Sequence, residues 1–243
     1  MDQSDINSLP SQPEIDKIDR TKNLDKSQLN ILEKYRMSFP GIDDNTLCRF
    51  LKARSFQLDK AESLLKEALE WRESSKPELI TFTEVEKWAN MRIVIRHGQD
   101  KQGRPLLILR NDRYLPKNIE LFEFEKYVLY VLEKSISEMP PNVDTFCIIS
   151  DMKESKLSNF NLSHTRHFIP IIQDYYPERL GAAFIVNFSW VVKSIWATVK
   201  VFLNEATLQK IQFLDSKEMA RLLEYFDESL LPAAYGGKAN VEL

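Results

Sequence analysis

The chain has 243 residues, of which 43% are hydrophobic, so it can bury a substantial core as one large domain or as a small domain joined to a larger one. Its 33 basic and 36 acidic side chains give a formal net charge of -3, so no nucleic-acid partner is expected, and any anion site must be local. Cys48 and Cys147 lie far apart in apolar surroundings, which favours free thiols and a cytoplasmic location. The first residues lack a basic stretch followed by an apolar one, so no secretory signal is expected.

The first part of the chain is predicted to be a leader followed by helices. Residues 1–27 are polar and acidic with two prolines, a composition typical of a mobile leader. Residues 28–90 are predicted to form an N-terminal helical module that ends in a connecting helix at 84–90. The glycines and proline of the next segment, GQDKQGRP, indicate a hairpin or turn. The other helical patterns of the module lie at 29–36, 44–53 and 59–74.

Strand and helix patterns alternate through the rest of the chain, which predicts an α/β domain with crossover helices. The strand patterns lie at 106–110, 145–150, 183–189 and 211–214, and the helical patterns lie at 121–138, 162–175, 190–203 and 216–225.

The segment 174–213 is the most informative because its apolar residues change period. Residues 183–189 have the composition of a buried strand, and 190–203 then follow helical spacing. Asn187, Lys193 and Lys200 interrupt the apolar run, so a membrane span is not expected. One stripe of the predicted helix suits either the wall of an apolar compartment or an ordinary core: Val192, Ile195, Trp196, Val199, Phe202 and Leu203.

Catalytic motifs are scarce, so no catalytic residue, metal or cofactor is assigned and the chain is not expected to be an enzyme. His164 and His167 have i, i+3 spacing, but no third ligand accompanies them. A phosphate-binding P-loop, a GxGxxG turn and a GxSxG elbow are all missing from the sequence. Asp151, at the end of a predicted strand, is interpreted as a cap for the next segment.

Five strings of residues carry a resemblance to a known family. They are DDNTLCRFLKARSFQLDKAESLLKEALEWR from Asp43, DKQGRPLLIL from Asp100, YYPERLGAAFIVN from Tyr175, FLNEATLQKIQF from Phe202, and LLPAAYGG near the C-terminal end. In this order and at these separations, the chain resembles the CRAL-TRIO lipid-transfer family, on its phosphatidylinositol-transfer (yeast-type) branch. The resemblance implies that residues 91–243 form a lipid-binding domain whose mostly parallel sheet is the floor of an apolar cavity closed by a mobile helical gate.

By position, the gate of the family resembles the predicted helix 190–203. The resemblance implies that this helix swings outward at a membrane, and that exposed aromatic and apolar residues of the gate contact the bilayer while Lys193 and Lys200 lie near lipid phosphates. A core role for the Trp196 stripe is the alternative. The gate residues are Trp190, Val192, Ile195, Trp196, Val199, Lys200, Phe202 and Leu203, with Trp190, Trp196, Val201 and Phe202 as bilayer contacts.

The headgroup residues of phosphatidylinositol-binding members also have counterparts here. The resemblance implies that Arg54 keeps the first member of a basic pair, whereas Ser55 replaces the second. Glu178 would accept hydrogen bonds from inositol hydroxyls, and an acidic residue often found after the gate is replaced by Asn204. Taken singly, each could instead be a cap or a surface charge. The predicted headgroup residues are Arg54, Glu178, Asn204, Thr207 and Lys210.

Members that exchange phosphatidylinositol for phosphatidylcholine carry hydroxyl residues and tyrosines in the pocket. Here Phe146 and Ile148 fall at the hydroxyl positions, and Leu107 and Leu132 fall near the tyrosine positions. Phosphatidylcholine is therefore expected to be a poor ligand, and a sterol-like hydrophobic lipid is the expected second ligand. A register error of one residue would turn these side chains to the other face of the sheet. The predicted pocket residues are Leu107, Leu132, Phe146, Ile148, Val186 and Phe188.

The resemblance implies a function without a covalent step. The chain would bind one phospholipid, with phosphatidylinositol as the expected ligand, and would transfer or present it between membranes that it touches transiently. The alternative is a lipid-responsive regulatory or scaffold module that presents lipid to a phosphoinositide kinase or recruits a protein partner. Both functions require the same cavity, so both stay open at this point.

Overall fold

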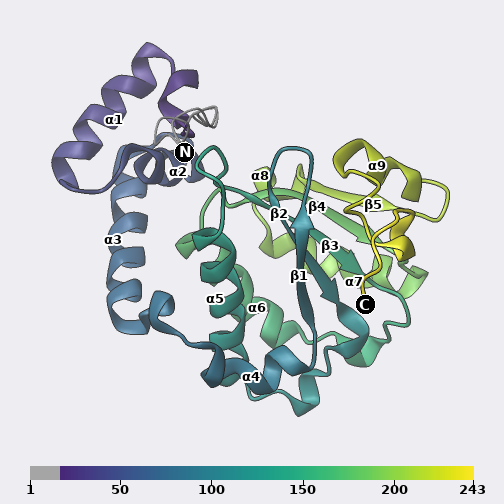
Figure 1. Cartoon of the computed structure of the whole chain (residues 1–243). Helices are drawn as coiled ribbons and strands as arrows, with labels where there is room; N and C mark the ends of the chain where they lie inside the picture. The colour runs from purple at the N-terminus through teal and green to yellow at the C-terminus, as the bar shows by residue number, and fades with distance from the viewer. Residues whose placement is uncertain (1–16) are drawn as a thin grey trace, which may run out of the picture.

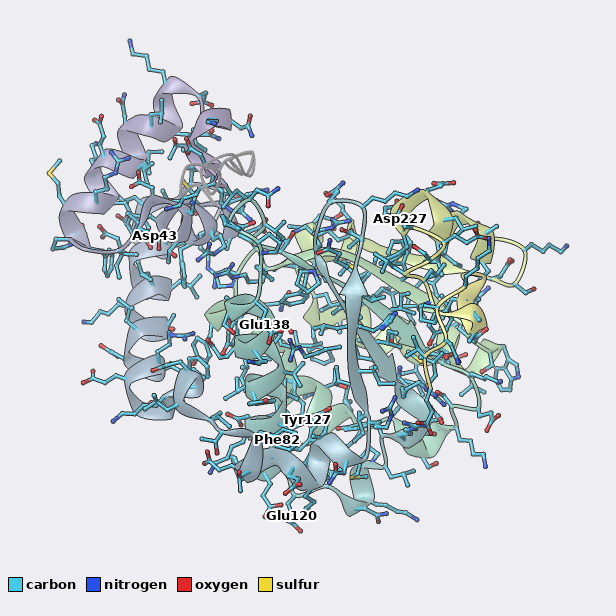
Figure 2. All side chains as sticks on the ribbon, viewed as in Figure 1. Asp43, Phe82, Glu120, Tyr127, Glu138 and Asp227 are labelled. Carbon is cyan, nitrogen blue, oxygen red and sulfur yellow. The ribbon has the colours of Figure 1, made fainter. Side chains whose placement is uncertain are left out.

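The N-terminal helices form a module with its own apolar core. The computed structural model describes residues 17–243 (Figure 1). Helices α1 (Lys26–Ser38), α2 (Asp44–Ala53) and α3 (Leu58–Ser75) precede α4 (Phe82–Asn90). Asp43, at the start of α2 in Figure 2, accepts a hydrogen bond from the Thr46 N–H and so satisfies a free donor of the first turn. The module core includes Leu32, Tyr35, Leu47, Phe50, Leu51 and Leu65.

Order begins earlier than the predicted leader allows. Residues 1–16 lie outside the described residues, but a 3-10 turn, η1 (Arg20–Asn23), already falls inside the predicted range 1–27. The Ile18 N–H donates to the Pro141 carbonyl at 2.9 Å, and Arg20 lies 2.5 Å from Asp144. These partners are more than a hundred residues away, so local composition gives no hint of them.

A sheet of five strands in the order β1-β2-β3-β4-β5 organises the rest of the described chain. Only β1 is antiparallel to its neighbour, so the predicted mostly parallel α/β fold is confirmed. Crossovers through α5 (Leu121–Ser137), α6 (Leu162–Pro170), and then α7 (Trp190–Val199) with α8 (Glu205–Leu208) keep the other strands parallel. The strands are β1 (Val94–Gln99), β2 (Pro105–Arg110), β3 (Phe146–Asp151), β4 (Leu180–Val186) and β5 (Ile211–Leu214).

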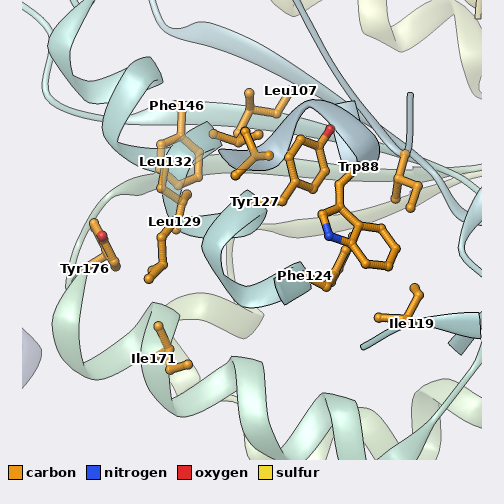
Figure 3. Close-up of a cluster of buried hydrophobic side chains, with 13 residues drawn as sticks. Trp88, Leu107, Ile119, Phe124, Tyr127, Leu129, Leu132, Phe146, Ile171 and Tyr176 are labelled. Atoms are coloured by element: carbon orange, nitrogen blue, oxygen red, sulfur yellow. The ribbon is translucent and has the colours of Figure 1, made fainter. Parts of the chain in front are cut away.

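The two faces of the sheet carry separate cores. Leu107 and Phe146 belong to a cluster with α4, α5 and the turn after α6, and Figure 3 shows Leu107, Leu132 and Phe146 grouped there. Leu106, Cys147 and other alternate residues pack on the opposite face against the C-terminal segment that contains α9 (Leu222–Tyr225). This alternation follows from the two-residue period of a strand.

Two predicted helices end differently from their patterns. The pattern at 162–175 divides into α6 and a π-helical turn, η6 (Ile171–Tyr175), because Pro170 has no N–H to continue the α-helical ladder. The pattern at 190–203 divides into α7 and a 3-10 turn, η7 (Lys200–Phe202). Within residues 17–243, no helix is long and apolar enough to cross a membrane.

Candidate functional site

An apolar cavity of about 420 Å³ lies between the sheet, α5, α6 and the end of residues 190–203, which are called the α7 segment below. This volume is within the usual range of small-molecule pockets, roughly 300–1,000 Å³. The wall is mostly aliphatic and aromatic, so the cavity favours a hydrocarbon guest over a polar one. Its apolar wall includes Leu107, Val128, Leu132, Phe146, Ile148, Phe168, Val199 and Leu203.

Four of the predicted pocket residues, Leu107, Leu132, Phe146 and Ile148, lie in this wall. Val186 does not: it is fully buried on the opposite face, because the register of β4 is one residue off the predicted one. Phe188 also lies outside the cavity wall and stacks on Phe213 with 5.2 Å between ring centroids. The prediction was wrong for these two residues.

The predicted gate residues divide between interior and surface. Val199 and Leu203 line the cavity, and Val192 is buried. Trp196 is half-buried and packs edge-to-face on Phe213. Trp190 is 78% exposed and Val201 is 68% exposed, so their apolar surface faces solvent. Lys200 is exposed, Ile195 is half-buried, and Phe202 lies under the guanidinium of Arg166.

A smaller polar pocket of about 100 Å³ adjoins the apolar cavity. The two compartments share the wall residues Ile169, Ile172 and Leu203, so they lie side by side. Residues from three distant segments meet in the polar pocket, including four of the five predicted headgroup residues. Its polar wall comprises Gln173, Glu178, Arg179, Asn204, Thr207 and Lys210.

Glu178 is the most constrained residue of the polar pocket. Its backbone adopts a left-handed conformation with φ of 58° directly after Pro177, a strained geometry that often marks a functional site. Its Oε2 atom lies 3.3 Å from Lys52 Nζ and 3.4 Å from Lys210 Nζ, and its side chain is only 8% exposed. Two ammonium groups and one carboxylate leave a net charge of +1, which favours an anion. Lys52 was missed from sequence, although it lies in the RFLKAR string.

Asn204 and Gln173 hold the end of the α7 segment. The Asn204 Oδ1 atom accepts from the Thr207 N–H at 2.8 Å and so begins α8. The Asn204 N–H donates to Gln173 Oε1 at 2.8 Å, and Gln173 Nε2 donates to the Phe202 carbonyl at 2.9 Å. Gln173 thus bridges η6 and the last residues of the predicted gate, a contact that sequence spacing does not reveal.

Family models match most of the chain. A model of the CRAL/TRIO, N-terminal domain matches residues 18–67, and a model of the CRAL/TRIO domain matches residues 89–237. The chain belongs to the CRAL-TRIO family.

Relatives extend this assignment. The phosphatidylinositol/phosphatidylcholine transfer protein SFH12 of Arabidopsis thaliana is 33% identical over 220 residues, which cover 82% of this chain and 40% of that protein. The Sec14 cytosolic factor of Schizosaccharomyces pombe is 30% identical over 218 residues, covering 82% of this chain and 76% of that protein. The chain therefore spans about two fifths of the Arabidopsis relative. The crystal structure of Sfh5 has a TM-score of 0.74 and 18% identity, covers 90% of this chain and 89% of its own, and shares the fold.

Arg54 is the predicted headgroup residue of the CRAL-TRIO pattern that does not reach the polar pocket. Its Nη2 atom binds Asp174 Oδ1 at 2.8 Å, while the neighbouring Ala53 contributes to the pocket wall. Ser55 and Phe56 have positive φ and turn the chain away directly after α2. Arg179 lines the pocket instead, and burial lowers its pKa, an effect that nearby Asp144 opposes.

The other polar residues noted in this CRAL-TRIO chain have separate partners. His164 Nδ1 lies 2.6 Å from the Tyr114 hydroxyl, and His167 Nε2 lies 2.6 Å from Glu125 Oε2. Within residues 17–243, no group of three or more His, Cys, Asp or Glu side chains has the arrangement of a metal site. Asp151 accepts hydrogen bonds from the Lys153 N–H and from Tyr235, so it is a buried cap.

Proposed function

We propose that this CRAL-TRIO chain binds one molecule of phosphatidylinositol, with its acyl chains in the apolar cavity and its inositol phosphate in the polar pocket, and transfers or presents it between membranes. The observation that carries the proposal is the shared wall of the two compartments at Ile169, Ile172 and Leu203. A lipid makes two separate demands, apolar walls for its chains and convergent polar groups for its headgroup. The adjoining compartments meet both.

The polar pocket supplies the groups that an inositol phosphate requires. Lys210 offers an ammonium to the phosphate, and among the described residues the Thr207 hydroxyl makes no hydrogen bond that would compete. Glu178 is a carboxylate acceptor for inositol hydroxyls. Lys52, which contacts Glu178, and Arg179, which lines the pocket, add positive charge in place of the second basic residue that Ser55 replaces.

Transfer requires the cavity to open and close, with no covalent step. The α7 segment is the proposed gate, because Val199 and Leu203 close one wall of the cavity while Trp190 and Val201 expose apolar surface on the outside. Contact with a bilayer would bury this exposed surface and stabilise an open gate. Closure would then shield the acyl chains during passage through water. Two relatives' names, which cite phosphatidylinositol and phosphatidylcholine transfer, support a transfer function.

The second ligand is proposed to be a sterol-like lipid in preference to phosphatidylcholine. Phe146, Ile148, Leu107 and Leu132 line the cavity with hydrocarbon, and this supports the assignment. Burial of a choline phosphate against such walls leaves the phosphate without partners, at a cost on the order of several kcal/mol.

Lys210→Ala tests the headgroup assignment in a vesicle transfer assay. The variant is expected to transfer phosphatidylinositol at least about tenfold more slowly, since a hydrogen bond to a charged group contributes about 1.5–3 kcal/mol. Lys66→Ala, which removes an exposed lysine of α3, is the matched control and should transfer normally. In the same assay the wild-type chain should extract much less phosphatidylcholine than phosphatidylinositol.

Three results of this assay would count against the proposal. Normal phosphatidylinositol transfer by Lys210→Ala would exclude the polar pocket as the headgroup site. Equal loss of phosphatidylinositol and of an apolar guest would indicate damaged folding. Uptake of phosphatidylcholine comparable to that of phosphatidylinositol would contradict the apolar assignment of Phe146 and Ile148.

A further inference from the structure

The apolar cavity contains a polar pair that the phosphatidylinositol proposal does not use. The Tyr114 hydroxyl and His164 Nδ1 are 2.6 Å apart, and both residues line the cavity. They come from different parts of the fold: Tyr114 follows β2, and His164 is in the first turn of α6. The polar pocket lies on another part of the cavity wall and does not include either residue.

Both members of the pair are held in place by their surroundings. The Tyr114 carbonyl accepts a hydrogen bond from Asn159 Nδ2 at 2.8 Å, and its ring packs on Phe124 with 5.4 Å between centroids. The His164 N–H donates to Asn161 Oδ1 at 3.1 Å, which caps α6. A polar group fixed in this way loses little conformational entropy when it binds a ligand.

The pair is uncharged. Burial and the neighbouring His167 lower the pKa of His164, and burial raises the pKa of Tyr114. The phenol therefore keeps its proton, and it donates a hydrogen bond to Nδ1 in the imidazole tautomer that carries its proton on Nε2. The guanidinium of Arg110, which also lines the cavity, is neutralised by the Asp112 carboxylate through contacts of 3.0 and 2.9 Å. Neither a phosphate nor a quaternary ammonium would find an opposite charge here.

The pair also keeps unused hydrogen-bonding capacity. Within residues 17–243, Tyr114 Oη makes only the bond to His164, and His164 Nε2 makes no hydrogen bond. In this tautomer the Tyr114 oxygen can still accept a hydrogen bond, and the N–H at Nε2 can donate one. By contrast, the amide of the neighbouring Asn159 is committed to the carbonyls of Asp112 and Tyr114. An uncharged donor-acceptor group is what this pair can bind.

We infer that Tyr114 and His164 form a recognition site for the hydroxyl group of an uncharged, otherwise apolar lipid. The inference rests on the proposed function only in that a lipid occupies the apolar cavity, and it assigns the chemical class of the second ligand. A hydroxyl can donate to Tyr114 Oη while its hydrocarbon body lies against the wall around Phe146 and Ile148. The hydroxyl can belong to a fused-ring alcohol such as a sterol or to a long-chain alcohol.

The test compares each alcohol with its methyl ether, which has the same apolar body without the donor. A fluorescent 3-hydroxysterol and a fluorescent long-chain alcohol, each with its ether, are titrated into wild type, Tyr114→Phe and Tyr130→Phe. Tyr130 is a half-buried tyrosine of α5 outside the cavity wall, so Tyr130→Phe is the matched control. Wild type and the control should prefer the alcohol about tenfold, equivalent to about 1.4 kcal/mol. Tyr114→Phe should bind alcohol and ether equally, with ether affinity unchanged.

Equal binding of alcohol and ether by wild type, or an alcohol preference that survives in Tyr114→Phe, would overturn the inference. A preference for only the ring alcohol or only the chain alcohol supports it and identifies the source. If Tyr114→Phe fails to fold, the wild-type protein gives an independent answer by NMR. The ring nitrogen resonances of His164 should shift when the alcohol is added and not when the ether is added. Resonances that do not shift with the alcohol overturn the inference. If the wild-type chain transfers phosphatidylinositol but shows no preference for the alcohol, this inference fails while the proposed function stands.

Discussion

Glu178 shows how a single residue can combine strain with recognition. Its left-handed backbone is unfavourable for a residue with a Cβ atom, and it lies between the buried Pro177 and the half-buried Arg179. The gain is geometric: one carboxylate reaches two lysines that are far apart in sequence. The same carboxylate is the proposed acceptor for inositol hydroxyls.

Glu178→Gln is therefore expected to change selectivity more than overall binding. The amide keeps an acceptor oxygen but loses the charge, and a charge-assisted hydrogen bond is roughly twice as strong as a neutral one. Preference for phosphatidylinositol over phosphatidic acid, which has a phosphate without inositol, should fall about fivefold to tenfold in a competition assay. An unchanged preference would remove Glu178 from the recognition of inositol.

The residues of the polar pocket could be predicted from sequence only where a string of residues carries them. Glu178, Asn204, Thr207 and Lys210 lie in two such strings and meet in the pocket. Arg54 lies in a third string, but its guanidinium binds Asp174, 120 positions away, which no pattern of residue types reveals. The Tyr114–His164 pair spans 50 positions in the sequence and could be found only in the folded chain.

At the scale of elements, apolar periodicity located most helices and strands but misjudged several ends. The predicted strand 183–189 extends too far because Phe188 continues the apolar run, whereas the strand stops at Val186. Asn187 ends it with a positive φ and a hydrogen bond to Asp151. Strand β1 was not predicted, because Arg96 and His97 hide its pattern and the predicted turn begins only at Gly98; as an edge strand it exposes one side to solvent.

The π-helical turn η6 is the element that links the gate to the polar pocket. The turn follows directly after Pro170. Within it, the side chain of Gln173 bridges the Phe202 carbonyl and the Asn204 N–H. Each such hydrogen bond contributes about 0.5–1.5 kcal/mol net. In the proposed mechanism this bridge would hold the last turn of the gate closed until bilayer contact opens it.

Gln173→Ala is expected to loosen the end of the gate without unfolding the domain. Amide hydrogen exchange at residues 200–204 should accelerate about tenfold, and bound phosphatidylinositol should dissociate faster. Gln209→Ala removes an exposed glutamine that bonds only Glu205 within α8, so it should leave both rates unchanged. If exchange at the gate is the same in Gln173→Ala and wild type, the bridge is not what retains the gate.

At the scale of the whole molecule, a buried ionic cluster joins the helical module to the lipid-binding domain. Asp144, just before β3, contacts Arg20 at 2.5 Å and Arg49 of α2 at 3.6 Å, and its carbonyl accepts from Arg179. Burial and the nearby Arg179 lower the pKa of Arg49 to about 10. The Asp144 carboxylate thus serves two guanidinium groups and its carbonyl serves a third, and the charge of the carboxylate holds the N-terminal residues against the sheet.

Asp144→Asn should consequently destabilise the folded chain strongly. The substitution leaves buried arginines without their carboxylate, and loss of one partner from a buried ion pair costs about 3–5 kcal/mol. Urea denaturation should show this loss of unfolding free energy. The control is Glu228→Gln, because the Glu228 and Lys238 side chains form an ion pair but are 51% and 71% exposed. It should cost less than about 1 kcal/mol. Hydrogen exchange should rise first in η1 and α2, since Arg20 and Arg49 carry the attachment. A loss for Asp144→Asn no larger than that for Glu228→Gln would mean that apolar contacts alone join the module to the domain.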